Sequence, residues 1–276
     1  MAAPLTRILS DLHFGDRGTR VSDLAQLRPL LDGADHLILN GDSLDTRPGP
    51  APQHTAECAA AIRDFFPRHV PRVTYHTGNH DADFSSDHTL DLAGGAVWVT
   101  HGDIFFPTIV PWSIDGPLVA RLVAEELRTL PCDPFADLAE HLALFRRVAL
   151  RIPQRHQSER NPVKYLASLL YETVWPPLRV FRIFAAWREA PRAAAMLARR
   201  HRPRARFVIA GHTHRAGIWP VRPGIVYINT GSFCQRLLGA TAVDVTAESL
   251  VVREVTLRGG EFRFGARVAE FPLAVG

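Results

Sequence analysis

The sequence lacks most of the features that mark secreted, disulfide-rich or membrane-spanning proteins. Its three cysteines, Cys58, Cys132 and Cys234, lie far apart and match neither a disulfide framework nor the spacing of a zinc site. No apolar run approaches the length of a membrane span. The first strand-like run begins so soon after Met1 that no room is left for a signal peptide. We therefore expect a cytoplasmic protein whose cysteines are reduced.

Lysine is almost absent as well, since Lys164 is the only one in 276 residues. Because the shortage extends over the whole chain, it indicates a bias in genomic base composition. The formal net charge of +4 is unevenly placed: residues 107–206 contain 17 Arg and Lys against 9 Asp and Glu, and the rest contain 15 against 19. An acidic body therefore carries one strongly basic internal segment, whose arginines are suited to phosphate recognition.

Five short apolar runs have the composition of buried strands, and each ends in a cluster of His, Asp or Asn residues. The clusters are Asp11-Leu12-His13, Asn40-Gly41-Asp42, Gly78-Asn79-His80-Asp81, His101-Gly102-Asp103 and Gly211-His212-Thr213-His214. Any one of them could be an ordinary turn, in which Gly allows a positive φ and Asp makes a local hydrogen bond. All five follow strands, however, and ligands collect at the carboxyl ends of strands in open α/β sheets. The pattern therefore predicts a metal site assembled at one edge of a sheet.

The order of patterns along the chain predicts a single domain with an insertion. Strand and helix patterns alternate up to residue 106, with helices expected from Ser22 to Leu31 and from about Gln53 to Phe66, which favours neighbouring parallel strands. Residues 107–204 show only helical spacing interrupted by prolines, typical of three or four helices. Strand patterns return after His214. We expect a catalytic domain formed by residues 1–106 and 205–276, with the helical insertion 107–204 folded over the sheet edge as a lid.

The five motifs, in this order, resemble those of the calcineurin-like metallophosphoesterase superfamily. The resemblance covers residues 5–106 and 205–235, and its motifs are highly specific. It implies a four-layer αββα sandwich, of the α+β or α/β class, with a site for two metal ions. By this resemblance one metal would be held by Asp11, His13 and His214, the other by Asn79, His101 and His212, and Asp42 would bridge them. It also implies that His80 binds the phosphate or protonates the leaving oxygen, and that Asp81 orients His80.

The chemistry of these residues agrees with that assignment. Two divalent ions close together need a shared anion between them, which a carboxylate such as Asp42 provides. Carboxylate, amide and imidazole donors suit Mn best, with Fe and Zn as alternatives, and Ca less well. A hydroxide that bridges the ions would be the nucleophile of a metal-dependent phosphoric ester hydrolase. We expect Asp45 to support its turn, and we expect the histidines outside the motifs to be surface or structural residues: His36, His54, His69, His76, His88, His141, His156 and His201.

The substrate is less closely defined by the sequence. The insertion lies between His101 and His214 and could roof the site, as in the bacterial UDP-2,3-diacylglucosamine hydrolases, whose His-Gly-Asp motif resembles His101-Gly102-Asp103. Those enzymes usually carry Arg where this chain has His80, and their lid residues have no match here. Residues 151–206 combine cationic and large apolar side chains: Arg151, Arg155, Arg160, Lys164, Arg179, Arg182 and Arg188 with Tyr165, Leu169, Trp175, Phe181, Phe184 and Trp187.

This combination suits a phosphorylated small-molecule or lipid-linked substrate, or an anionic membrane surface. We therefore expect a nucleotide-sugar or lipid-linked pyrophosphate as substrate and an enzyme peripheral to the inner face of the cytoplasmic membrane. The competing interpretation is that Trp175, Phe181, Phe184 and Trp187 form the core of the insertion itself. A nucleic-acid or cyclic-nucleotide phosphodiesterase and a protein phosphatase stay open as alternatives. Nucleic acid is disfavoured because aromatic and basic residues do not interleave in the sequence. A non-catalytic scaffold is disfavoured because every ligand position is kept.

Overall fold

The computed structural model describes residues 4–131, 133–154, 163–164, 167, 178–234 and 238–273. Several residues singled out in the sequence lie outside the described residues: Cys132, Arg155, His156, Arg160, Tyr165, Leu169 and Trp175. Of the other cysteines, Cys58 is buried and Cys234 half-buried, and both are free thiols.

The first sheet has six strands in the order β11-β10-β9-β1-β2-β3. Its strands are β1 (Thr6–Leu9), β2 (His36–Asn40), β3 (Arg72–His76), β9 (Ala240–Val245), β10 (Ser249–Arg258) and β11 (Glu261–Pro272). β1, β2 and β3 are parallel, with Ile8 opposite Ile38 and Leu39 opposite Tyr75. β9 pairs with β1, β10 with β9 and β11 with β10, and all three pairings are antiparallel. The alternating patterns of the N-terminal part therefore produce the expected parallel strands.

The second sheet has five strands in the order β4-β5-β6-β8-β7. Its strands are β4 (Thr89–Leu92), β5 (Val97–Thr100), β6 (Phe207–Ala210), β7 (Gly217–Val221) and β8 (Ile225–Asn229). β5, β6 and β8 are parallel, and β4 and β7 are antiparallel edge strands. β5 and β6 come from the two sides of the helical insertion and lie next to each other. The insertion therefore leaves and re-enters the domain at neighbouring strands.

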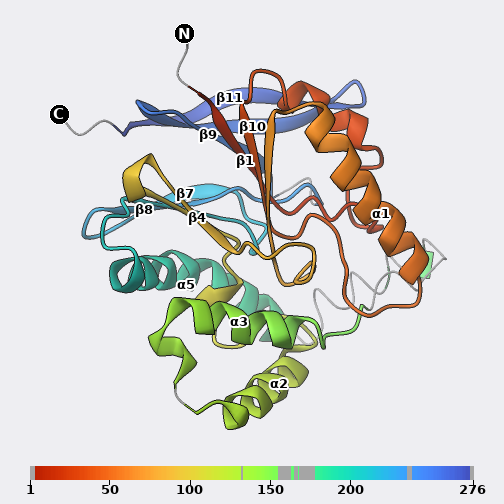
Figure 1. Cartoon of the computed structure of the whole chain (residues 1–276), viewed down its shortest axis with the longest axis vertical. Coiled ribbons are helices and arrows are strands. Elements are labelled where there is room, and N and C mark those ends of the chain that lie inside the picture. The colour runs from red at the N-terminus through yellow and green to blue at the C-terminus, as the bar shows by residue number, and fades with distance from the viewer. Residues whose placement is uncertain are drawn as a thin grey trace.

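The two sheets pack face to face, with helices on both outer faces (Figure 1). Apolar side chains of both sheets, such as Ile8 and Ile38 of the first and Val99 and Ile209 of the second, form one buried cluster between them. The outer face of the first sheet is covered by the 3₁₀ helix η1 (Leu24–Leu30) and by α1 (Pro52–Phe65). The outer face of the second sheet is covered by α5 (Leu178–His201), and α2 (Gly116–Thr129) and α3 (Leu138–Ala149) share the same apolar cluster on that side of the molecule. These four layers confirm the predicted αββα sandwich.

The described helices of the insertion lie outside the second sheet, and the expectation that residues 107–204 form a lid over the sheet edge stays a prediction. The C-terminal half of α5 presents a face of small residues, including Ala190, Ala194 and Ala198, to the second sheet. Small side chains let the helix lie close to the strands, where it shares a core with Trp98 and Tyr227. Near its N-terminus, in contrast, Phe181 and Phe184 are exposed. The interpretation of these two phenylalanines as core residues of the insertion is therefore wrong.

The helix ends that the sequence predicts agree with the structure only in part. The expected helix from Ser22 to Leu31 is the 3₁₀ helix η1, and its N-cap is Asp23, whose carboxylate accepts a hydrogen bond from the Ala25 N–H. The other short 3₁₀ helices are η2 (Phe66–Arg68), η3 (Ala93–Gly95), η4 (Asp103–Phe105) and η5 (Pro134–Ala136). In the part of the chain that the structure describes, no helix is both long enough and apolar enough to cross a membrane.

Candidate metal centre

The five polar clusters meet where the carboxyl ends of strands from both sheets come together. Three clusters follow β1, β2 and β3 of the first sheet, and two follow β5 and β6 of the second. The expectation of a site at the edge of one sheet is therefore corrected: the site lies at the junction of two. The two sheets are joined there directly, because Asn40 Nδ2 at the end of β2 donates to the carbonyl of Thr100 at the end of β5 at 2.9 Å.

The backbone of the site is strained in a consistent way. Among the described residues, seven non-glycine residues have a positive φ: Asp11, His13, Asp42, Ala93, Ile109, His212 and His214. Five of these seven are predicted metal ligands. Left-handed backbone costs free energy for residues with a Cβ and persists where the surrounding structure imposes it, which is commonly at functional sites. The left-handed backbone at these residues turns their side chains toward the site directly after each strand ends.

Glycines beside the ligands allow the loops to approach closely. Gly41 has a φ of +83°, and a Cβ added there would lie 2.5 Å from Nδ1 of His101. A Cβ at Gly211 would lie 2.0 Å from the carboxylate of Asp11. Because real Cβ atoms do not approach other atoms so closely, each glycine is required by a ligand from a different strand end.

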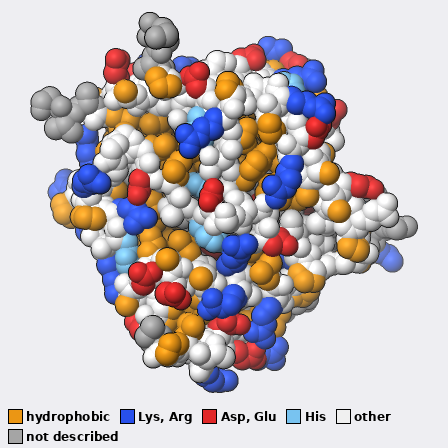
Figure 2. Space-filling view, viewed as in Figure 1, with side chains coloured by type: hydrophobic (Ala, Val, Ile, Leu, Met, Phe, Trp, Pro, Cys, Tyr) orange, Lys and Arg blue, Asp and Glu red, His pale blue; other side chains and the backbone are white. Residues whose placement is uncertain are grey.

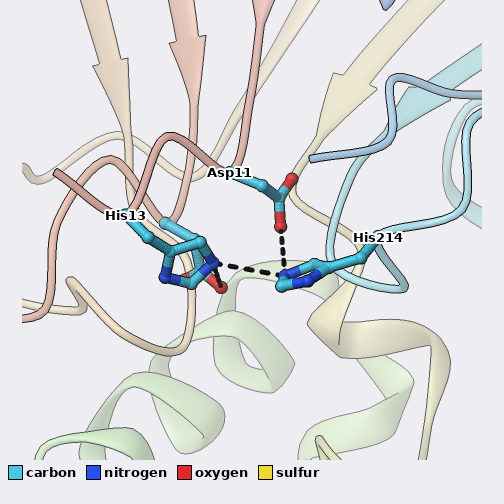
Figure 3. A group of neighbouring side chains, drawn as sticks. Asp11, His13 and His214 are labelled. Atoms are coloured by element: carbon cyan, nitrogen blue, oxygen red, sulfur yellow. Dashed lines mark hydrogen bonds and ion pairs between the residues drawn. The ribbon is translucent and has the colours of Figure 1, made fainter. Parts of the chain in front are cut away.

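The first group of side chains consists of Asp11, His13, Asp42 and His214, whose donor atoms all lie within 4.8 Å of one another. His13 Nε2 and His214 Nε2 are 3.2 Å apart, and His214 Nε2 lies 3.2 Å from Asp11 Oδ1. Figure 3 shows the side chains of Asp11 and His13, from the loop after β1, and that of His214, from the loop after β6, converging on one point. Two imidazoles and two carboxylates brought this close offer four ligands to one cation.

The second group consists of Asp42, His101 and His212, again within 4.8 Å. His101 Nδ1 lies 3.0 Å from the Asn40 carbonyl and His212 Nε2 lies 2.9 Å from the Ile109 carbonyl, and in each case the ring N–H donates. Each bond leaves the other ring nitrogen as a free lone pair, so that His101 offers Nε2 and His212 offers Nδ1. Hydrogen bonds of this kind orient the histidine ligands of metal sites.

Asn79, the remaining ligand predicted for the second group, offers an amide oxygen. Its side chain is buried, and its Oδ1 has no hydrogen-bond partner in the described part of the chain. A buried polar atom without a partner is costly, so native structures rarely keep one without a purpose. This orphaned oxygen fits the ligand role predicted for Asn79. Asp42 belongs to both groups, and its Oδ2 lies 3.3 Å from His101 Nε2 and 3.8 Å from His13 Nε2.

Electrostatics favour the metal-binding protonation state at Asp42, His13 and His212 but not at His101. Burial by itself would raise the pKa of Asp42, but the neighbouring His101 and His80 lower it well below its usual value. Burial lowers the pKa of His212 to about 3 and, together with His80, lowers that of His13 to about 4. At neutral pH Asp42 is therefore ionised and His13 and His212 are neutral. Burial by itself would lower the pKa of His101, but Asp42 raises it well above its ordinary value, so His101 releases a proton when a cation binds.

His80 lies at the side of the first group and is held by Asp45 and Arg47. The rings of His80 and His13 make an edge contact, with centroids 4.8 Å apart. His80 Nδ1 lies 3.1 Å from Asp45 Oδ2 and 2.8 Å from Arg47 Nη2, and the same Asp45 oxygen accepts from Arg47 at 2.7 Å. Although burial lowers the pKa of His80, the carboxylates of Asp42 and Asp45 raise it above its ordinary value. Nδ1 is thus occupied, and Nε2 is the nitrogen left for proton transfer.

Asp81 does not orient His80, and this part of the predicted site is wrong. Its carboxylate accepts hydrogen bonds from the backbone N–H groups of Gly78 at 2.6 Å, Ser43 at 2.7 Å and Asp42 at 3.0 Å. Burial and the nearby Asp42 raise the pKa of Asp81 to about 7. Its role in the structure is to tie the loop of Asp42 to the loop of Asn79. The orienting carboxylate is Asp45, which the sequence suggested only as a support for its turn.

Arg47 is the functional side chain that the sequence reasoning missed. It lies two residues beyond Asp45, in a loop whose sequence is typical of an ordinary Pro/Gly turn. The pair of Asp45 and Arg47 is buried, with side-chain exposures of 3% and 11%. The sequence does show an acidic and a basic residue two positions apart, Asp45 and Arg47. Their link to His80 appears only in the structure, where His80 lies beside them.

The sequence matches no protein-family model and no curated protein. Among solved structures it is similar to vacuolar protein sorting 29 from Cryptosporidium parvum, with 12% identity, a TM-score of 0.46 and coverage of 98% of both chains. A dimetal phosphatase from Danio rerio has 13% identity and a TM-score of 0.43 over 96% of this chain and 99% of that one. A predicted phosphoesterase from Streptococcus pneumoniae has 14% identity and a TM-score of 0.38 over 99% of both. Similarities this weak carry no conclusion about activity, which depends on the geometry of the site.

Proposed function

We propose that this protein is a dinuclear metal-dependent phosphoesterase. The observation that carries the proposal is the pair of donor groups, Asp11, His13, Asp42 and His214 on one side and Asp42, His101 and His212 on the other. They share one buried carboxylate, and Asn79 adds an orphaned amide oxygen to the second. Two cations in such a site would lower the pKa of a bound water and neutralise the oxygens of a phosphate ester. We propose manganese as the metal, with iron and zinc as alternatives, because the donors mix imidazole with oxygen.

The chain's own residues then have separate tasks. Asp42 would supply the negative charge shared by two cations, and its Oδ1 accepts a hydrogen bond from the backbone N–H of His80 at 2.8 Å. His80, whose pKa is raised by neighbouring carboxylates, carries the proton that the leaving oxygen needs. Nδ1–H of His80 donates to Asp45, and Arg47 holds Asp45 in place, so that Nε2 keeps one direction. No serine or cysteine nucleophile is required for this chemistry.

Metal content and hydrolysis test the proposal together. The protein purified with Mn²⁺ should retain two metal ions per chain by elemental analysis and should hydrolyse p-nitrophenyl phosphate or bis(p-nitrophenyl) phosphate. Dialysis against a chelator should abolish hydrolysis, and Mn²⁺ should restore it. The matched control is Asp83→Asn, which changes an exposed carboxylate that contacts Thr46 near the site. If the protein binds no metal and Mn²⁺ stimulates no hydrolysis, the proposal is refuted.

For the substrate, we propose a nucleotide-sugar or lipid-linked pyrophosphate reached from the inner face of the cytoplasmic membrane. Support comes from the N-terminal part of α5, where the apolar side chains Leu178, Phe181 and Phe184 are 64%, 70% and 54% exposed. Arg182 and Arg188 of the same helix are also exposed. Large exposed apolar side chains next to arginines suit the headgroup region of an anionic bilayer. The occupant of this helix face is then an anionic lipid surface.

Vesicle binding tests the membrane proposal. The protein should sediment with phosphatidylcholine vesicles that contain phosphatidylglycerol, and much less with phosphatidylcholine alone. Phe181→Ser combined with Phe184→Ser should weaken binding by at least about tenfold, because each phenylalanine contributes about 1.5–3 kcal/mol when buried. Met196→Ser is the matched control, since Met196 is 64% exposed near the other end of the same helix. Equal sedimentation of the double variant and the wild type would refute this role of α5.

A further inference from the structure

A cavity of about 510 Å³ lies between α5 and the edge strand β7. Its described lining contains five arginines and no carboxylate: Arg188, Arg192, Arg199, Arg215 and Arg222. None of the five forms an ion pair with a carboxylate among the described residues. On the face viewed in Figure 2 the basic side chains lie scattered among acidic and apolar ones. The five arginines of this cavity, in contrast, line the same concave surface. Their charges repel one another, so binding of an anion among them is favoured.

The cavity begins at the loop that carries two of the proposed metal ligands. Trp187 Nε1 on α5 donates to the carbonyl of Thr213 at 3.0 Å, and Thr213 lies between His212 and His214. Arg215 follows His214 directly and enters the cavity lining. The near end of the cavity is therefore joined to the candidate metal centre through a stretch of four consecutive residues.

Arg215 is held in place by two tryptophans. Its guanidinium carbon lies 5.0 Å from the ring centroid of Trp187 and 5.5 Å from that of Trp219. Cation–π contacts on both sides restrict the rotamers of the side chain, so less entropy is lost when it binds a ligand. Because Arg215 covers one face of each tryptophan ring, those faces are not free to stack on nucleic-acid bases. The two rings instead position the guanidinium group.

The far end of the cavity lies well away from the metal centre. From Arg188 to Arg199 the helix advances eleven residues, about 16 Å at 1.5 Å per residue. At that end Arg199 Nη2 donates to the carbonyl of Arg222 at 2.6 Å, just beyond β7. The positive charges are therefore spread along a groove that starts beside the loop of His212 and His214 and leads away from it.

We propose that this arginine groove binds the distal phosphate groups of a substrate that carries more than one phosphate, while the reacting phosphate lies at the metal centre. The assignment rests on the proposed phosphoesterase function. Guanidinium groups bind phosphate oxygens through two parallel hydrogen bonds, which a planar fork provides and an ammonium does not. A monophosphate would engage only the metal centre, whereas a bisphosphate of suitable length would engage both places.

Binding of matched ligands tests the groove without relying on turnover. Titration calorimetry on the Mn-loaded protein would compare alkanediol bisphosphates of increasing chain length with the corresponding alkyl monophosphates. The wild type should bind the best bisphosphate at least about tenfold more tightly than its monophosphate, as expected for one added charge-assisted contact. Arg192→Gln combined with Arg199→Gln should bring the bisphosphate to the affinity of the monophosphate. Arg200→Gln, an exposed arginine of α5 outside the groove, should leave the difference intact.

The outcomes separate the groove from the proposed function. If p-nitrophenyl phosphate is not hydrolysed but the bisphosphate advantage is present and depends on Arg192 and Arg199, the groove stands and the phosphoesterase proposal fails. Equal affinity for bisphosphate and monophosphate in the wild type would overturn the groove, even in an active enzyme. A single-stranded oligonucleotide that outcompetes every bisphosphate, with the same dependence on the two arginines, would overturn it in favour of a nucleic-acid site.

Discussion

Asp45→Asn is the most informative single change at the candidate site, because it tests the one role that the structure reassigned. Asp45 is buried, and its Oδ2 lies 3.1 Å from His80 Nδ1 and 2.7 Å from Arg47 Nη2. Burial by itself would raise the pKa of Asp45, but His80 and Arg47 hold it below its ordinary range, so the carboxylate is charged at neutral pH. Asparagine keeps the shape and removes the charge.

The size of the effect follows from the distance between the charges. A unit charge pair at 3.1 Å is worth about 5 kcal/mol at an effective dielectric constant of about 20. Arg47 repels the same imidazolium and offsets part of this attraction. The net contribution is therefore closer to that of a hydrogen bond to a charged group, about 1.5–3 kcal/mol. This range corresponds to a fall in kcat of roughly 10–100-fold.

Steady-state kinetics with metal analysis provide the assay. Asp45→Asn should keep two metals per chain, and its loss should be larger for phenyl phosphate than for p-nitrophenyl phosphate, because a poor leaving group needs the proton of His80 more. Asp45→Asn combined with His80→Ala should be no slower than His80→Ala alone, since Asp45 acts through His80. Asp83→Asn should behave as the wild type. Loss of metal in Asp45→Asn, or full additivity with His80→Ala, would refute the reasoning.

Three further predictions concern other parts of the chain. Asp42→Asn should lose metal as well as activity, because two cations would then face each other without a shared charge; metal content equal to that of Asp45→Asn would contradict the bridging role. His80→Ala should retain both metals and lose about 10²–10⁴-fold in kcat, and loss of metal would make it a ligand instead. Burial, aided by His201, lowers the pKa of His141 from 6.5 to about 4. Between these pH values the unfolded chain binds more protons than the folded one, so stability falls by about 3 kcal/mol as pH drops from 6.5 to 4. His141→Phe, placed between Phe135 and Phe145, should remove this dependence in denaturant titrations at both pH values, and an unchanged slope would refute the account.

The sequence by itself determined the kinds of ligand and the strand ends that carry them. Asp11, Asp42 and His101 each follow an apolar run, and the alternation of strands and helices indicated parallel strands next to one another. These are local properties, since side-chain chemistry and strand periodicity can be read within a few residues. The αββα layers, in contrast, are not a local property, and they were expected only because the five motifs resemble those of the calcineurin-like metallophosphoesterases.

Only the tertiary structure decided what each residue touches. Asp81 follows His80 directly in the sequence and Asp45 precedes it by 35 residues, yet Asp81 binds three backbone N–H groups and Asp45 reaches the imidazole. The choice depends on how the loop after β2 faces the loop after β3, which no local pattern contains. Likewise, the arginine groove joins α5 to β7, two elements that become neighbours only when the insertion packs as the outer layer of the second sheet. Contacts between distant segments follow from packing of the whole chain, whereas ligand identity follows from the residue alone.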